Sequence, residues 1–190
     1  MPAAKRISKE AIIDAAAAVL RIGGFEAINA RSVAKALGCS TQPIYLSFRN
    51  MEELKSALTQ RAIEQHTQRV RESLRAHEGC DSRYSSYGMG FVQFAAQEKQ
   101  LFRWLYLEDN QPGRHQEDVL EPEIIRTVMD EFGYDEVTAR AFHRDMTYYS
   151  YGLAILANTG HLALTETELR EAFRREFRAL AADYGPPKKL

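Results

Sequence analysis

The feature that most constrains this chain is a pair of short helical segments joined by a glycine. The first covers residues 30–37, follows Asn29, a good N-cap, and ends at Gly38. The second covers about residues 41–48 and carries Pro43 in its first turn, where a missing N–H costs little. This spacing predicts a helix-turn-helix, a motif whose second helix enters the major groove of DNA.

The rest of the chain is also predicted to be helical, because apolar residues recur every three to four positions and no segment alternates as a strand does. The longer helices are expected over residues 8–22, 50–78, 82–98, 117–132, 135–158 and 166–184. An apolar segment over 101–107 should be buried, and a loop should follow over 109–115. We predict an all-α protein of about nine helices. Its parts are a three-helix DNA-binding domain over 1–50 and a helical domain over 51–190, opened by a linking helix over 51–78.

Charge is divided unevenly along the chain. Residues 1–75 hold twelve Lys or Arg and seven Asp or Glu, whereas the whole chain has a net charge of −1. A basic N-terminal part on an acidic remainder is typical of polyanion binding, although chance clustering explains the charges equally well. No apolar run approaches the ~20 residues of a membrane span, and no signal segment is evident. We expect a cytoplasmic protein with no membrane partner.

The second short helix supplies the best candidates for DNA contacts. Thr41 and Gln42 lie at its N-terminal end, where base edges are met, and Gln can pair with adenine through a donor and an acceptor. Lys35 and Tyr45 are placed to reach phosphates, which add affinity without sequence information. The candidate DNA-binding residues are Arg31, Lys35, Ser40, Thr41, Gln42, Pro43, Tyr45 and Arg49.

Residues 8–54 resemble the DNA-binding domain of the tetracycline-repressor (TetR) family. The shared features are Gly24-Phe25, the segment NARSVA at 29–34, Gly38, the segment STQPIY at 40–45, Phe48 and the segment EEL at 52–54. The resemblance implies a homodimer that represses a pseudo-palindromic DNA operator and is released by a small-molecule effector. It also implies that residues 51–190 bind this ligand and form the dimer.

The family usually carries a lysine three residues after Phe48, and this chain has Met51 there. A phosphate contact from that side chain is therefore lost, and we hypothesise that Arg49 compensates. Residues 81–184 resemble one branch of the family more weakly. The Trp and His-Gly typical of that branch are replaced by Thr147 and Tyr151-Gly152, so we infer no ligand from it.

Aromatic side chains are abundant in the C-terminal part, where they form either a core and dimer interface or a ligand pocket. The candidate ligand-binding residues are Phe91, Trp104, Tyr148 and Tyr151. The apolar stripes of the last two helices are predicted to pack with their copies in a four-helix dimer interface, the alternative being a core within one chain. The candidate dimer residues are Phe142, Met146, Tyr149, Leu153, Leu169, Phe173 and Phe177.

The sequence shows no catalytic constellation and no Gly-rich phosphate loop, and His77 and Cys80 are only two candidate metal ligands, so we expect neither an enzyme nor a cofactor or metal site. Cys39 and Cys80 are expected to be free thiols. The leading hypothesis is a ligand-responsive DNA-binding regulator. A ligand-independent regulator is the alternative, and an enzyme on a helical scaffold is less favoured.

Overall fold

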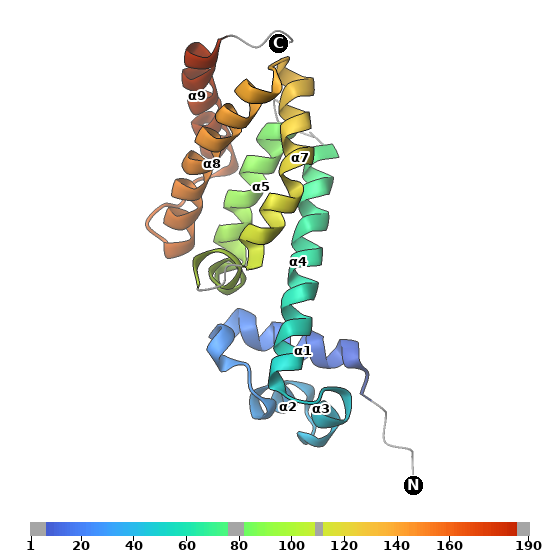
Figure 1. Ribbon diagram of the computed structural model, residues 1–190. Coiled ribbons are helices and arrows are strands. Elements are labelled where there is room, and N and C mark those ends of the chain that lie inside the picture. Colours follow the sequence, from blue (N-terminus) through green and yellow to red (C-terminus); the bar gives the residue numbers. More distant parts are fainter. Residues whose placement is uncertain (1–6, 76–81, 109–111, 186–190) are drawn as a thin grey trace. The chain divides into compact units, whose positions relative to one another are not determined.

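The computed structural model describes residues 7–75, 82–108 and 112–185 (Figure 1). Across these ranges the regular elements are helices, with no strand, as the sequence predicts. The nine α-helices within them are α1 (Lys9–Gly23), α2 (Ala30–Leu37), α3 (Gln42–Ser47), α4 (Met51–Arg75), α5 (Arg83–Gln97), α6 (Lys99–Phe102), α7 (Pro112–Phe132), α8 (Glu136–Thr159) and α9 (Glu166–Tyr184). A π-helical turn, Arg103–Leu107, continues α6.

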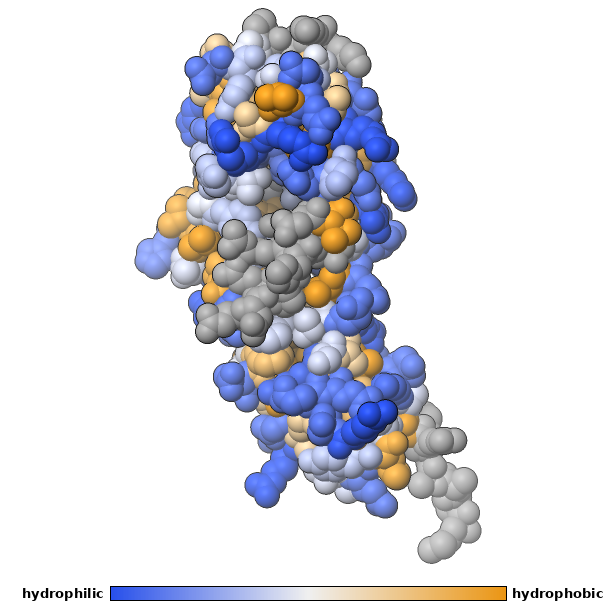
Figure 2. All heavy atoms as spheres, viewed as in Figure 1, coloured by the Kyte–Doolittle hydropathy of each residue, from blue (hydrophilic) through white to orange (hydrophobic). Residues whose placement is uncertain are grey.

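The chain folds into two compact units. We call Met1–Gln65 together with Gln100–Arg114 the N-terminal unit, and His66–Lys99 together with His115–Leu190 the C-terminal unit. On the face shown in Figure 2, hydrophilic side chains predominate and hydrophobic ones form separate small groups. None of the described helices is long and apolar enough to cross a membrane.

The N-terminal unit is built on the apolar stripe of α1. Ile12 and Ala16 of this stripe are fully buried, in one cluster with Val33 of α2, Ile44 of α3 and Leu54 of α4. The helix begins where predicted, because the Ser8 hydroxyl accepts the backbone N–H of Ala11 at 3.1 Å. α1, α2 and the start of α4 therefore hold α3 from one side.

Local signals fix both ends of α2. The Asn29 side chain accepts the N–H groups of Arg31 and Ser32, and the Ser32 hydroxyl accepts the N–H of Asn29 in return. The helix ends at Gly38, whose φ of +66° lies in the left-handed region. No atom lies within 4 Å of where a Cβ of Gly38 would be, so backbone conformation, not space, favours glycine here.

The segment from α6 to Leu107 packs within the N-terminal unit. The Trp104 ring stacks on the Phe25 ring with 3.4 Å between centroids, and its indole N–H donates to Thr59 Oγ1 at 3.2 Å. The Lys55 ammonium lies 4.7 Å from the centre of the same Phe25 ring. The predicted burial of 101–107 is confirmed for Phe102, Leu105 and Tyr106, which pack within the N-terminal unit. It is wrong for Leu107, which is 39% exposed at the end of the turn.

In the C-terminal unit, α5 packs against α8 and α9. A Cβ at Gly88 would lie 2.8 Å from the Phe173 ring, so glycine allows α5 to approach α9 this closely. The Asn158 side-chain amide donates to the carbonyls of Ala95 and Lys99, where α5 gives way to α6. These contacts fix the helices around a pocket described below.

Two expectations differ from the structure or extend beyond it. A loop was expected over 109–115, but α7 begins at Pro112, so residues 112–115 are helical. Proline suits the first helical position because its missing N–H would be unpaired there anyway. Residues 109–111 of that loop and residues 76–78 of the predicted linking helix lie outside the described residues.

Candidate functional site

The outward face of α3 is set by two buried residues. Ile44 in the helix and Phe48 just after it are almost completely buried in the N-terminal unit. Gln42, Tyr45 and Leu46 are therefore left exposed, Tyr45 to 55% and Leu46 to 80%. A short helix with a polar amide, a phenol and an aliphatic side chain on its free face can meet base edges in a groove.

The basic residues predicted for phosphate contact are also exposed. Arg31, Lys35 and Arg49 are on the surface, and no ion pair engages them in the part of the chain that the structure describes. Their charges are therefore available to a polyanion. Ser40 is exposed as well, whereas Thr41 and Pro43 are half-buried.

The start of α4 is fixed by reciprocal hydrogen bonds. Asn50 Oδ1 accepts the N–H of Glu53 at 2.9 Å, and the Glu53 carboxylate accepts the N–H of Arg49 at 2.8 Å. This last bond is the main reason that the pKa of Glu53 is lowered. The Asn50 side chain thus caps the start of α4, and the carboxylate of Glu53 binds the backbone of Arg49, not that of Asn50. Met51 packs half-buried against the core and is no substitute for a phosphate-binding lysine.

Sequence reasoning missed Leu46. It lies four residues after Gln42, hence on the same helical face, and that spacing was the available signal. An exposed aliphatic side chain at this place suits contact with the methyl group of thymine.

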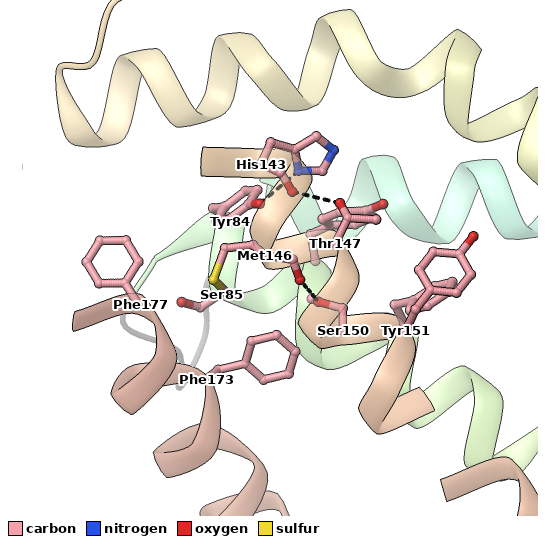
Figure 3. A pocket seen from close by; sticks show the side chains of 12 residues that line it. Tyr84, Ser85, His143, Met146, Thr147, Ser150, Tyr151, Phe173 and Phe177 are labelled. Carbon is pink, nitrogen blue, oxygen red and sulfur yellow. Dashed lines mark hydrogen bonds between the residues drawn. The ribbon is translucent and has the colours of Figure 1, made fainter. Parts of the chain in front are cut away.

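A second candidate site is a pocket inside the C-terminal unit (Figure 3). Its walls come from α5, α8 and α9, and none of the lining residues is Asp, Glu, Lys or Arg. The lining residues are Tyr84, Ser85, Tyr87, Gly88, Phe91, His143, Met146, Thr147, Ser150, Tyr151, Phe173 and Phe177. Within the pocket, the centre of a water molecule has about 20 Å³ of free space.

One end of the pocket holds a neutral hydrogen-bonded pair. The Tyr84 hydroxyl and His143 Nδ1 are 2.8 Å apart. Burial lowers the pKa of His143 to about 4, and burial also raises the pKa of Tyr84 well above its usual value. Both groups are therefore uncharged at neutral pH, and the whole lining is uncharged with them.

Comparison with known proteins identifies the N-terminal unit. Residues 12–58 match the family model of bacterial regulatory proteins of the tetR family, and this match covers α2, the turn and α3. These residues are therefore a DNA-binding domain of the tetR family. A DNA-binding transcriptional regulator, which the resemblance implied, is supported at this level. No curated protein sequence matches the chain significantly.

Two solved structures share the fold along most of the chain. A candidate transcriptional regulator from Pseudomonas aeruginosa PAO1 has a TM-score of 0.63 at 17% identity, covering 92% of this chain and 88% of that one. The fatty acid degradation regulator FadR from Bacillus halodurans has a TM-score of 0.58 at 16% identity, covering 96% and 97%. At these identities the likeness is one of fold.

The four residues predicted for ligand binding lie in three places. Phe91 and Tyr151 line the pocket, with 4.9 Å between their ring centroids. Trp104 packs on Phe25 in the N-terminal unit and is not among the lining residues. Tyr148 is 67% exposed, on the side of α8 that faces away from the pocket.

The residues predicted for dimer formation turn toward the core of their own unit. Phe142, Met146, Leu169 and Phe173 are buried within the single chain, whereas Tyr149, Leu153 and Phe177 are half-buried. Met146, Phe173 and Phe177 line the pocket. The apolar side chains that α8 exposes are instead Val137, Tyr148, Ile155 and Leu156.

Two substitutions on the DNA-binding surface should have different effects. Arg49→Ala should weaken binding to every duplex and reduce the slope of log affinity against log salt by about one, because one phosphate contact is lost. Gln42→Ala should leave that slope unchanged and cost about 1–3 kcal/mol only at the preferred sequence, because a base contact is lost. Fluorescence anisotropy titrations at several salt concentrations measure both. An unchanged salt slope for Arg49→Ala would remove Arg49 from the phosphate contacts.

Proposed function

We propose that the protein is a homodimeric repressor that binds a pseudo-palindromic operator through α3 and is released by a small molecule in the C-terminal pocket. The observation that carries the DNA-binding part is the exposed face of α3, held by buried Ile44 and Phe48 and flanked by the available cations Arg31, Lys35 and Arg49. Thr41, Pro43 and Ser40 belong to the same surface. Because DNA is in the cytoplasm of a bacterium, a cytoplasmic location remains part of the proposal.

The proposed dimer forms through the outward face of α8. Val137, Tyr148 and Ile155 are separated by eleven and seven residues, about three and two turns, so they share one side of the helix. Val137 is 80% exposed and Tyr148 67%, which is unusual for a stripe of apolar side chains unless it binds a partner. A second copy is the occupant that the function calls for, since two heads are needed to read two half-sites.

The proposed release of the operator depends on the chain segment that connects α5, which lines the pocket, to α6 and the π-helical turn. α5 supplies five of the lining residues and leads directly through Glu98 into α6 and the π-helical turn. That turn carries Trp104, which packs on Phe25 within the N-terminal unit. A ligand that shifts α5 therefore acts on a segment anchored on Phe25 and on Thr59 of α4. It changes operator affinity only if it binds the two states differently.

A ligand-independent regulator is the second candidate. The observation that favours it is the small free space of the pocket, about 20 Å³ for water centres, which holds about one water molecule. Under this alternative, the C-terminal unit serves dimerisation alone, and no small molecule alters operator affinity.

Selection of bound duplexes from a random DNA library, repeated at two salt concentrations, tests the proposed function. We expect enrichment of a pseudo-palindromic sequence, with affinity that falls as salt rises because phosphate contacts release counterions. Enrichment of a sequence without two-fold symmetry would contradict the dimeric arrangement. Absence of any enriched sequence would contradict operator binding itself.

The charged variant Ile155→Glu should separate the dimer, because a carboxylate on the outward face of α8 would be desolvated in the interface without a partner. We expect a mass of one chain by multi-angle light scattering and a loss of operator affinity of at least about 100-fold. Tyr148→Glu, at a more exposed position, should do the same without disturbing the fold. Ile22→Glu makes the same substitution at an exposed site on α1 and should leave a dimer. A dimer in all three variants would place the interface elsewhere.

Coupling between the pocket and α3 should depend on Trp104. Because linkage is reciprocal, operator binding should shift the methyl NMR resonance of Met146 in the pocket. The variant Trp104→Leu should reduce this shift by about half or more, since the stacking on Phe25 is lost. Met129 on α7 is the internal control. A shift of the same size in Trp104→Leu would show that the signal travels by another route.

A further inference from the structure

The chemistry of the C-terminal pocket indicates which molecules it accepts. We propose that the pocket takes an uncharged ring compound that carries a hydroxyl or N–H hydrogen-bond donor. This inference rests on the ligand-responsive part of the proposed function and names the class of its ligand. Four observations support it: the lining is uncharged, its walls are aromatic, two of its hydroxyl groups already donate to the backbone, and a groove adjoins it.

The first argument is the absence of a counter-ion. The lining contains no Asp, Glu, Lys or Arg, and the hydrogen-bonded pair of Tyr84 and His143 is neutral because the loss of water lowers the pKa of His143 to about 4 and raises that of Tyr84. A carboxylate or ammonium would leave water without gaining a charge partner, which is strongly unfavourable. An uncharged ligand loses far less on entry.

The second argument is the character of the walls. Phe91 of α5 lines the pocket with its ring 4.9 Å from that of Tyr151, centroid to centroid. Figure 3 shows the rings of Tyr151 on α8 and Phe173 on α9. Rings of this kind favour offset or edge contacts with another ring. Met146 also lines the pocket, and its flexible thioether can adapt to the outline of what enters.

The third argument concerns two hydroxyl groups on α8. Thr147 Oγ1 donates to the carbonyl of His143 at 2.8 Å, and Ser150 Oγ donates to the carbonyl of Met146 at 2.8 Å (Figure 3). With their protons committed to their own helix, these oxygens face the pocket as acceptors. The complementary group on a ligand is a donor.

The fourth argument is a groove next to the pocket through which a ligand can enter. Tyr87 and Phe91 line the pocket and also an adjoining groove between α4 and α5, where water centres have about 370 Å³. Rotation of these two rings would join the two spaces and give a ring compound room that the space of about 20 Å³ in the pocket alone does not offer. The groove carries Arg69 and Glu72, so charged molecules find partners there, outside the pocket. The groove therefore suits charged molecules, whereas the pocket suits uncharged ones.

The test uses phenol, anisole and benzoate as three single-ring probes. Phenol is an uncharged ring with a donor, anisole replaces the donor proton by a methyl group, and benzoate carries a charge. The chain has five methionines, so methyl-labelled methionine gives a simple NMR spectrum in which Met146 reports on the pocket. Its signal is assigned with the variant Met146→Leu. We expect phenol to shift this signal with a Kd about 5-fold lower than anisole and at least about 10-fold lower than benzoate.

Thr147→Val is the informative variant, because it keeps the shape of the side chain and removes the acceptor. It should bring the Kd values of phenol and anisole within about 2-fold of each other. Thr159→Val is the matched control, since Thr159 donates to the carbonyl of Ile155 in the same way but lies exposed near the end of α8. The control should retain the preference for phenol.

The outcomes separate the two proposals. Benzoate that shifts Met146 as strongly as phenol would overturn the ligand class, and so would an undiminished preference for phenol in Thr147→Val. If none of the probes shifts Met146, this pocket does not take small ring compounds and the inference fails. A protein that binds phenol at Met146 but enriches no duplex would overturn the proposed regulator and leave the ligand class standing.

Discussion

The burial of Ile44 and Phe48 is the constraint on which the DNA-binding surface depends. α3 has only six residues, too few for a helix to be stable by itself in water. Burying an isoleucine and a phenylalanine contributes about 1.5–3 kcal/mol each, which offsets much of the cost of ordering so short a helix. The same burial decides which side chains remain outside. Gln42, Tyr45 and Leu46 are exposed because the burial of Ile44 and Phe48 turns the other side of α3 outward.

Local signals made the N-terminal unit predictable. The caps at Ser8 and Asn29, the left-handed glycine at Gly38 and the proline in the first turn of α3 all act over a few residues. Such signals can be found in the sequence, so the observed bounds of α2 equal the predicted ones. Leu46 was missed because an apolar residue in a short helix is ordinarily assigned to the core, and only the structure shows its exposure.

The C-terminal unit was less predictable because periodicity indicates a stripe but not its partner. α8 has one apolar stripe through Phe142 and Met146 and a second through Val137, Tyr148 and Ile155. The sequence alone does not indicate which of the two stripes packs against the core. The structure shows that the first packs against α5 and α9, where the approach at Gly88 leaves no room for a Cβ. Trp104 illustrates the same limit, since its partner Phe25 is far away in the chain.

Hydrogen exchange of the full-length protein with and without a selected duplex tests the central claim most directly. We predict slower exchange in peptides that cover residues 38–50, because the turn, α3 and the start of α4 would face the DNA. Peptides from the pocket-lining part of α5 should change much less. Protection that spares residues 38–50 and falls instead on another surface would contradict the assignment of α3 as the element that reads DNA.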